Sequence, residues 1–512
     1  MKKYVPWFVL PIILLAGCAC SRDLVPDGVL KGLHKPVINK VNPAGIQFNN
    51  AGFYLSVVLE KAEDDQYVLY LNEKKVGRAE LGYNNNNLGW MISTELIGEL
   101  LSSAPNGAPF SIRVTGINEN YDISGDFNKY HDYVSEPVAF EIQKGKMQFS
   151  TARQLFPEWT HSKEPIIRCD SKGNIYLAWL EKINGNYEAF FSSSADAGIT
   201  WSQVLNISRS MGSVDHVDLA VDGSGHLFLI WGGISTSSVD FSRSMDNGVT
   251  WYFPTSISSH DEFARNPAIT IDNDGVILLA WRKQVDNVYT EIVLNSSSDC
   301  GNTWSRRVLA TPDKVNMDWN GELVLTSGAE GELYLVASRN IEDKKGFYFF
   351  SSYDHGNTWQ MNDVETKNIN PFMKYTSARF GNENQLYYVW GDARTSGHYA
   401  WNQNCFLRRE SSGDWGEIQD LRDICWANDA KTALSVSVED IHVALTVFGG
   451  LLLIHSSDGG RNWSYPETVP GTNCPICTRW PDMVLHPSGK TFLVFASKID
   501  TVDGCLYFMQ FE

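Results

Sequence analysis

The chain has 512 residues, few basic side chains for that length and, beyond its first 15 residues, no long apolar run. Its 42 Lys and Arg residues are outnumbered by 60 Asp and Glu residues, which gives a formal net charge of -18. An acidic chain is a poor match for nucleic acid or for a broad anionic lipid surface, because like charges repel. We therefore expect no nucleic-acid partner. Since no later stretch is long enough to cross a bilayer, we also expect no permanent membrane-spanning helix.

Metal and cofactor signatures are also missing. His216, His442 and His486 occur singly, without the spacing of metal ligands. The segment Asp272-Asn-Asp-Gly275 is similar to the start of a calcium loop, but it lacks the later ligands, and a hairpin turn explains it better. Cys474-Pro-Ile-Cys477 has neither a second CxxC pair nor a βαβ setting. We therefore expect no metal and no cofactor.

The nine cysteines do not define a disulfide framework. Two of them, Cys18 and Cys20, lie near the N-terminus, and the odd number that remains leaves at least one thiol free or paired with Cys20. Cys405–Cys425 and Cys474–Cys477 are plausible pairs, but spacing alone cannot assign them. For the second pair, two free thiols are the alternative.

The N-terminus has the pattern of an export signal. Met1-Lys-Lys is followed by an apolar run from Tyr4 to Leu15 and then by Leu15-Ala-Gly-Cys18. The ending resembles the bacterial lipobox, which implies a signal peptide at residues 1–17, lipidation of Cys18 and a linker at residues 18–34. The resemblance further implies a cell-envelope protein held to the membrane by its lipid, in the outer membrane if the source is Gram-negative. An ordinary signal peptide with a coincidental cysteine is the alternative.

Five copies of the phrase S-x-D-x-G-x-T/N-W dominate the rest of the chain; they span Ser194–Trp201, Ser244–Trp251, Ser297–Trp304, Ser352–Trp359 and Ser456–Trp463. Asp and Ser side chains bond backbone N–H groups in tight turns, and Gly supplies the positive φ that such turns need. The final Trp starts a strand, where aromatic residues pack well. Each copy therefore predicts a hairpin corner, with a structural role for Asp196, Asp246, Asp299, Asp354 and Asp458.

The phrase resembles the Asp box, or BNR repeat, of sialidases and other β-propellers. A second repeat consists of apolar strands that start roughly fifty residues apart, at Ile175, Leu227, Ile277, Leu333, Leu386, Ile441 and Thr491. These strands predict an all-β propeller over residues 144–512, with seven blades favoured and six possible. A strand at Lys146–Thr151 would complete the last blade and close the ring. In the fifth unit the box is degenerate and reads Ser411-Ser-Gly-Asp-Trp415.

Residues 35–143 contain no Asp box. Short apolar strands alternate with polar loops there, and Glu95–Leu101 predicts one or two helical turns. The strand spacing predicts a β-sandwich. Pro36–Pro43 and Ser135–Ile142 are similar to parts of IPT/TIG-type immunoglobulin-like domains. The resemblance implies a spacer, with carbohydrate or protein binding as the alternative.

The resemblance to sialidases implies a site at the central mouth of the ring, opposite the boxes. That family uses three arginines, a Tyr–Glu pair and an Asp, with an Arg-Ile-Pro phrase in the first blade. Here Glu164-Pro-Ile-Ile-Arg168 stands in its place. The phrase is absent and seven blades depart from the six of sialidases, so the sequence leaves open whether the chain is an enzyme.

Polar residues nevertheless gather where inner strands begin and second strands end. Arginines there suit carboxylates, tryptophans suit sugar rings, and paired carboxylates suit acid–base work. The candidate ligand-binding residues are Arg168, Asp215, His216, Arg265, Arg282, Arg394, Arg479, Trp480 and Asp482. Our leading hypothesis is a propeller that binds a glycan or an envelope protein at its channel mouth. The alternatives are an exo-acting glycoside hydrolase of sialidase type and a structural envelope scaffold, in which these residues line a solvated channel and tie the blades together.

Overall fold

The computed structural model describes residues 35–512, except residues 43–44, 49–52, 61–65, 73, 80, 85–86, 104–108, 118–132, 145–146, 210–211, 234–236, 260–262, 285–289, 310–322, 329–330, 342–343, 366–375, 382–384, 397–398, 411, 422–431, 439, 448–449, 473–477 and 498–503. The predicted signal peptide, Cys18 and the linker lie outside the described residues, as do Cys425, Cys474 and Cys477. The chain divides into two compact units, one comprising Met1–Asn42 and Tyr54–Ile142 and the other Pro43–Phe53 and Gln143–Glu512.

The N-terminal unit contains two groups of hydrogen-bonded strands and one described helix, α2 (Thr94–Ser103). The first group runs in the order β1 (Ile38–Asn42), β3 (Phe53–Leu59), β7 (Asn87–Ile92) and β6 (Leu81–Asn84). The second runs in the order β9 (Val138–Lys144), β8 (Pro109–Ile117), β4 (Gln66–Leu71) and β5 (Lys74–Arg78). Trp90 is fully buried, and its indole donates to the Gly77 carbonyl at 3.0 Å. The predicted helical turns are confirmed; the immunoglobulin-like assignment stays a prediction.

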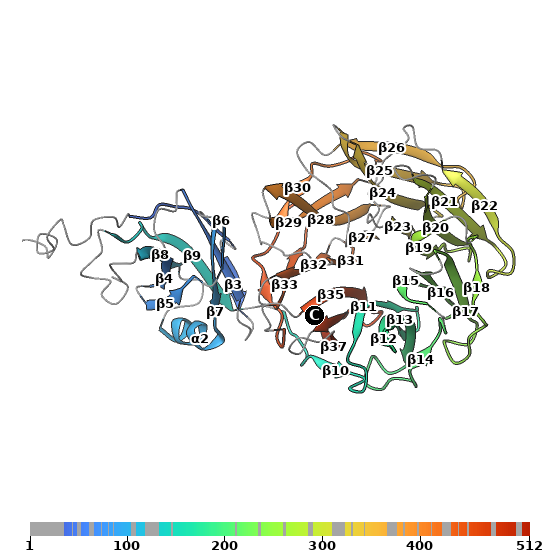
Figure 1. Ribbon diagram of the computed structural model, residues 1–512, viewed down its shortest axis with the longest axis horizontal. Helices are drawn as coiled ribbons and strands as arrows, with labels where there is room; N and C mark the ends of the chain where they lie inside the picture. Colours follow the sequence, from blue (N-terminus) through green and yellow to red (C-terminus); the bar gives the residue numbers. More distant parts are fainter. Residues whose placement is uncertain are drawn as a thin grey trace, which may run out of the picture. The chain divides into compact units, whose positions relative to one another are not determined.

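The second unit is a ring of seven antiparallel blades (Figure 1). Its strands, from the centre outward in each blade, are β11 (Ser162–Cys169), β12 (Ile175–Ile183), β13 (Asn186–Ser194) and β14 (Leu205–Asn206); β15 (Val214–Val221), β16 (Leu227–Gly233), β17 (Val239–Ser244) and β18 (Thr255–Ser256); β19 (Arg265–Ile271), β20 (Ile277–Gln284), β21 (Thr290–Ser297) and β22 (Ser305–Leu309); β23 (Leu323–Ser327), β24 (Leu333–Ile341), β25 (Lys344–Ser352) and β26 (Gln360–Glu365); β27 (Ser377–Phe380), β28 (Leu386–Ser396), β29 (Tyr399–Arg409) and β30 (Gln419–Asp420); β31 (Ala433–Ser437), β32 (Asp440–Val447), β33 (Gly450–Ser456) and β34 (Glu467–Thr468); and β35 (Thr478–Leu485), β36 (Thr491–Ser497), β37 (Cys505–Phe511) and β10 (Arg153–Leu155). In the sixth blade, β2 (Gly45–Phe48) adds a parallel strand to β34. The favoured count of seven blades is confirmed.

The two ends of the second unit close the ring. Strand β10 pairs antiparallel with β37, in the register Arg153↔Phe508 to Leu155↔Leu506. Just upstream, the Gln148 and Ser150 amides donate to the carbonyls of Glu512 and Gln510 at 3.1 and 2.8 Å. The sequence predicts the closing strand at Lys146–Thr151; Gln148 and Ser150 make the first contacts, and the regular strand follows later, at Arg153–Leu155.

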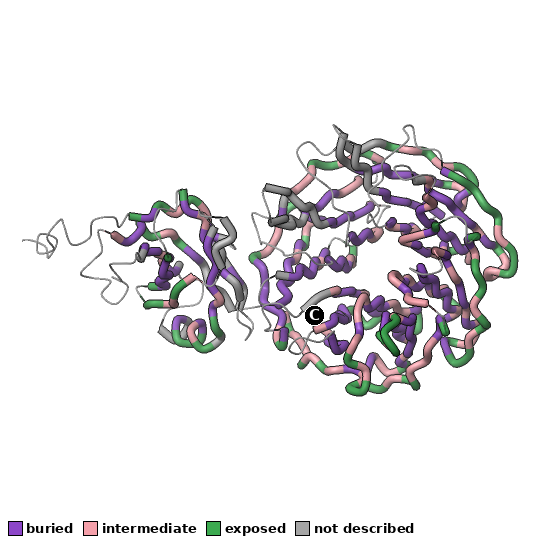
Figure 2. The backbone as a smooth tube through the Cα atoms, in the orientation of Figure 1, coloured by how far each residue is buried: buried purple, intermediate pink, exposed green. Residues whose placement is uncertain are grey.

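The core lies between neighbouring blades. Second strands such as β12 and β16 are apolar and buried almost throughout, because both of their faces are covered by the adjoining sheets (Figure 2). Four of these strands place a fully buried Trp in the stack, namely Trp179, Trp231, Trp281 and Trp390. Between the first and second blades, Ile166, Tyr176 and Leu219 belong to one apolar cluster. Burial on both faces explains the continuous apolar runs that set the second repeat. No helix in the described part of the chain is long and apolar enough to span a membrane.

Candidate functional site

Four inner strands are irregular at the same place, near their first residues. The ladder shifts register between Lys163 and Ile166, Val214 and His216, Arg265 and Ala268, and Arg479 and Asp482. In three of these strands a residue before proline has a positive φ: Glu164 (51°), Asn266 (50°) and Trp480 (53°). Such a conformation is sterically costly before proline, and strain of this kind gathers at functional sites. Bulges also redirect side chains, so the strand entrances are shaped differently from the rest of the ladder.

The three strained positions share a sequence. Lys163-Glu-Pro165, Arg265-Asn-Pro267 and Arg479-Trp-Pro481 each place a basic residue two before the proline. The Lys163 ammonium lies 3.9 Å from the centre of the Tyr187 ring, so it is occupied by a cation–π contact. Of the two arginines among these three basic residues, Arg265 is the one whose side chain the structure describes, and it contacts Asp215. The side chains of Arg479 and Arg394 lie outside the described residues.

Charged side chains of opposite sign meet at the mouth of the channel. Arg265 Nη1 lies 3.2 Å from Asp215 Oδ2, and His216 Nδ1 lies 3.7 Å from Glu164 Oε2. Arg265 also stands opposite Arg282 in the ladder, and Arg282 is buried. Burial raises the pKa of Asp215 and the nearby Glu164 adds to the rise, against the opposing effect of His216 and Arg265. Together these side chains form the mouth cluster, namely Glu164, Asp215, His216, Arg265 and Arg282.

A second polar cluster lies deeper in the channel. Arg168 bonds Asp482 Oδ2 at 2.9 Å and Asp218 Oδ1 at 3.2 Å. Arg379 Nη2 lies 3.6 Å from Asp482 Oδ1. Arg168 and Arg379 occupy the same register in their blades, opposite Tyr176 and Tyr387. Burial, and then the like charge of Arg168, lower the pKa of Arg379. Arg168, Asp218, Arg379 and Asp482 are called the channel cluster below.

The two aspartates of the channel cluster also join blades. Asp482 in the last blade accepts from the Ile167 amide of the first blade at 3.0 Å. Asp218 in the second blade accepts from the Ile269 amide of the third at 3.0 Å. An acceptor that is bonded to a backbone donor and to an arginine is well satisfied, which offsets the cost of burying its charge. The channel cluster therefore has a structural role, whatever else it does.

The cavity at the channel cluster is small. It measures about 70 Å³ and is lined by all four residues of the cluster, by His216, and by small or apolar side chains of the fourth to sixth blades. Binding sites for organic ligands usually measure about 300–1,000 Å³, whereas a water molecule occupies about 30 Å³ in the liquid. The cavity therefore suits water or one small group. A whole sugar ring does not fit into it.

The remaining candidates are placed as follows. Arg168 and Asp482 belong to the channel cluster, and Asp215, His216, Arg265 and Arg282 to the mouth cluster. Trp480 packs against the apolar core between the last and first blades, which withdraws part of its ring from any sugar. Sequence reasoning missed Asp218, Arg379 and Glu164 as site residues. Asp218 lies two residues after His216, on the same face of the strand, and Arg379 has the same strand position as Arg168. Aligning the blades by strand position could therefore have identified both residues.

The Asp boxes form corners on the other face of the ring. They follow the third strand of a blade, and antiparallel pairing puts that point at the end opposite the strand entrances. In the fourth box, the Gly356 amide donates to Ser352 Oγ at 2.9 Å, and Thr358 donates to both oxygens of Asp354 at 2.7 and 2.6 Å. These hydrogen bonds lower the pKa of Asp354 to about 2. The same pattern recurs at Asp196, Asp299 and Asp458, where the pKa is also about 2.

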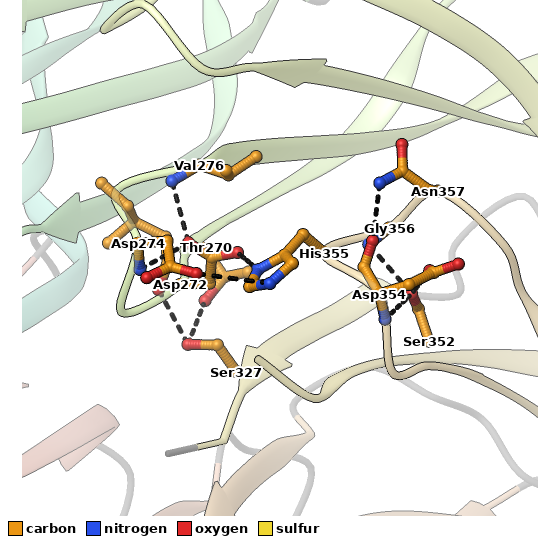
Figure 3. Close-up of polar contacts among 11 residues, drawn as sticks. Thr270, Asp272, Asp274, Val276, Ser327, Ser352, Asp354, His355, Gly356 and Asn357 are labelled. Carbon is orange, nitrogen blue, oxygen red and sulfur yellow. Dashed lines mark hydrogen bonds and ion pairs between the residues drawn. The ribbon is translucent and has the colours of Figure 1, made fainter. Parts of the chain in front are cut away.

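The box corners bond to the neighbouring blade as well. Arg243, Arg307 and Arg408 each donate to a backbone carbonyl of the next box, at Cys300, Asn357 and Gly459. In the fourth box, His355 Nδ1 lies 2.8 Å from Asp272 Oδ2 and His355 Nε2 lies 3.3 Å from Asp274 Oδ2 (Figure 3). The hydrogen bond that His355 donates to the Asp272 carboxylate raises the pKa of His355. The described residues contain no group of three or more His, Cys, Asp or Glu side chains arranged to hold a metal ion.

Comparisons with known proteins agree with this architecture. The profile of the BNR repeat-like domain matches residues 216–386, so the chain contains such a domain. No functionally curated protein matches the chain by sequence. A PL25 ulvan lyase structure superposes with a TM-score of 0.51 at 12% identity, over 70% of this chain and 95% of the lyase. The NanB sialidase of Streptococcus pneumoniae gives a TM-score of 0.41 at 12% identity, over 90% of this chain and 83% of the sialidase. At this identity the likeness shows the fold alone, and the predicted Asp-box propeller is confirmed.

Proposed function

We propose that the propeller binds a glycan at its channel mouth. The observation that carries the proposal is the mouth cluster, in which guanidinium and carboxylate groups alternate above a cavity too small for a sugar ring. A sugar hydroxyl both donates and accepts, so a surface of alternating donors and acceptors matches it. Phe263, two residues before Arg265, is 52% exposed and offers an apolar ring beside the charges. An acidic sugar would additionally pair its carboxylate with an arginine.

Replacing Arg265 tests this proposal. Arg265→Ala removes a charged donor, and hydrogen bonds to charged groups contribute about 1.5–3 kcal/mol, so we expect affinity to fall by about 10- to 100-fold. Binding is measured on an array of acidic and neutral oligosaccharides and then by calorimetry. Arg243→Ala is the matched control, because it removes the same charge from the box face. Unchanged binding in Arg265→Ala, or capture of an envelope protein and no glycan by the intact chain, contradicts the proposal; the second result favours a scaffold role.

One observation favours glycoside hydrolysis as a second candidate. Burial, with a contribution from the nearby Glu164 carboxylate, raises the pKa of Asp215, and a carboxyl group with a raised pKa can serve as a general acid. Against it, the side chains that line the described channel cavity include no tyrosine that could act as a sialidase nucleophile. Turnover of fluorogenic sialosides and other glycosides, abolished by Asp215→Asn while glycan binding persists, would establish this second function.

We further propose that the chain is an envelope lipoprotein. The support is Leu15-Ala-Gly-Cys18 after a basic start and a short apolar run. Lipid on Cys18 would hold the protein in the outer membrane of a Gram-negative cell, with the N-terminal unit as a spacer. Cys18→Ala should move the protein from the membrane fraction to the soluble fraction and abolish incorporation of labelled palmitate. Cys20→Ala is the control and should leave both unchanged.

A further inference from the structure

A second, larger hollow lies on the outer rim, where the ring closes. Its volume is about 630 Å³, within the range of about 300–1,000 Å³ that is typical of ligand sites. One wall is the segment 153–159, which contains β10 and the turn after it, and the other is the segment 199–204, which leads from the first Asp box to β14. This closure groove is distinct from the mouth cluster, because its second wall begins in a box on the opposite face of the ring.

Aromatic side chains form the floor of the closure groove. Phe156, Trp159 and Trp201 line it, and each is only half-buried. They are fixed by ring contacts: Phe156 stacks on Trp179 at 5.2 Å between centroids, and Trp159 lies 5.0 Å from Phe190. The Trp201 indole nitrogen is buried and has no hydrogen-bond partner among the described residues, so Trp201 offers the groove its ring and not its N–H group. Rigid rings of this kind present apolar area to a ligand at little entropic cost.

The rim of the closure groove is polar but offers no spare cation. Both terminal nitrogens of Arg153 donate to box carbonyls, those of Gly198 and Ile199, the latter at 2.7 Å. Glu158 is exposed and would repel an anion, whereas Gln154 and Gln203 carry both donors and acceptors. The described lining therefore favours an uncharged ligand that is rich in hydroxyl groups.

The backbone of the closure groove is strained at its corner. Phe156 has a φ of 47° and precedes Pro157, and a bulky residue in that region is a conformational outlier. Its carbonyl accepts from the Trp159 amide at 2.9 Å, which closes the turn that carries both rings. Local strain of about 1–3 kcal/mol persists only where the surroundings impose it, and it concentrates at ligand clamps.

The second blade provides an internal comparison. Its residues Tyr252 and Phe253 follow the box Trp as Ser202 and Gln203 do in the first blade, and the Tyr252 and Ser202 amides make equivalent backbone bonds. Phe253 is 77% exposed. The same chain thus places two aromatic side chains at these positions in one blade and two smaller polar ones in the other. The smaller pair lines the closure groove and leaves its aromatic floor accessible.

We propose that the closure groove is a separate binding site for an uncharged stretch of polysaccharide. Pyranose rings would pack their C–H faces on Trp159 and Trp201, while Gln154, Gln203 and Glu158 would bond the hydroxyls. This site goes beyond the proposed mouth function and does not depend on it.

The test copies the second blade into the first. Gln203→Phe fills the groove without removing any ring, and we expect it to weaken binding of neutral hexasaccharides by at least about tenfold. Cellohexaose, xylohexaose and mannohexaose are titrated into the full chain, with tryptophan fluorescence and calorimetry as readouts. Gln203→Ala, which leaves the groove open and removes one amide, should weaken binding less and guards against misfolding of the first variant. Phe253→Gln is the matched control and should change nothing.

Two results would overturn the site. One is that none of the three hexasaccharides binds the intact chain; the other is that Gln203→Phe binds as tightly as the parent. Loss of hexasaccharide binding in Arg265→Ala, with Gln203→Phe unaffected, would likewise assign that binding to the mouth and reject the groove. If Arg265→Ala alone loses binding of acidic glycans, the mouth proposal is supported even when the hexasaccharide experiments reject the groove.

Discussion

The two faces of the propeller differ in how their polar groups are satisfied. On the box face, Ser, Asp and Thr bond within one corner, and the same bonds recur from box to box. At the other face, Asp215, Arg265 and Glu164 lie on different blades, and the described entrances differ in most of their side chains, although three of them share a basic residue and a proline. Repetition thus marks a corner that the fold reuses in five of its seven blades, and divergence marks where a ligand could be selected. Breaking each face separately should give different phenotypes.

The largest effect is expected from Asp482→Ala in the channel cluster. The side chain is 7% exposed and serves Arg168, Arg379 and the Ile167 amide at once. Removing one partner of a buried ion pair costs about 3–5 kcal/mol, because the other charge is left buried. Urea unfolding followed by tryptophan fluorescence measures the loss. Asp482→Asn keeps the acceptor for the Ile167 amide and should lose less; equal losses would show that the charge does not matter.

The next effect concerns the box face. In the parent protein the buried Gly248 amide donates to Ser244 Oγ at 2.9 Å, and Ser244→Ala removes this acceptor. An unsatisfied buried donor costs about 1–3 kcal/mol, so the free energy of unfolding should fall by that amount. Glycan binding should not change, because the mouth lies at the opposite face. Ser193→Ala is the control and should be nearly neutral. Ser193 precedes Ser194, the first-box equivalent of Ser244, and its hydroxyl bonds Ser202 at the surface. A loss of glycan binding without a loss of stability would contradict the division between the faces.

Strand positions explain how much could be predicted from sequence. Six of the seven second strands begin at the predicted residue, and β32 begins one residue early at Asp440. These strands are buried on both faces, so their composition alone identifies them. The site was harder to predict, because pairs such as Arg168 and Asp482 come from opposite ends of the unit. The bulges before Pro165, Pro267 and Pro481 also change side-chain direction in a way that alternation does not reveal. Trp480 shows the consequence, since it packs into the core.

A smaller effect is expected in acid. The pKa of Asp299 is lowered to about 2 by bonds from Thr303, against an ordinary value of about 3.9. A lowered pKa stabilises the fold above the ordinary value, and that contribution disappears as the pH falls from about 4 to about 2. Asp299→Asn should therefore flatten part of the fall in melting temperature over this range. Arg265→Ala at the mouth should leave the dependence of melting temperature on pH unchanged. If Arg265→Ala changes this dependence and Asp299→Asn does not, the acid sensitivity does not come from the box.

The smallest effect is expected at His355, where two blades meet on the box face. Asp272 raises its pKa, with Asp274 and Asp354 adding to the rise, although the ring is 39% exposed and solvent weakens the contact. A raised pKa stabilises the fold fully below the ordinary value of about 6.5, and the contribution is lost as the pH rises through the raised value. The melting temperature should therefore fall slightly between neutral and mildly alkaline pH. His355→Asn introduces the residue that the second box has at Asn247, and it should remove that slope while keeping the corner. Asp274→Asn should reduce the slope only in part, because the shorter bond to Asp272 remains. If the slope persists in His355→Asn, the pH dependence belongs to another group and the contact in Figure 3 is only a packing contact between blades.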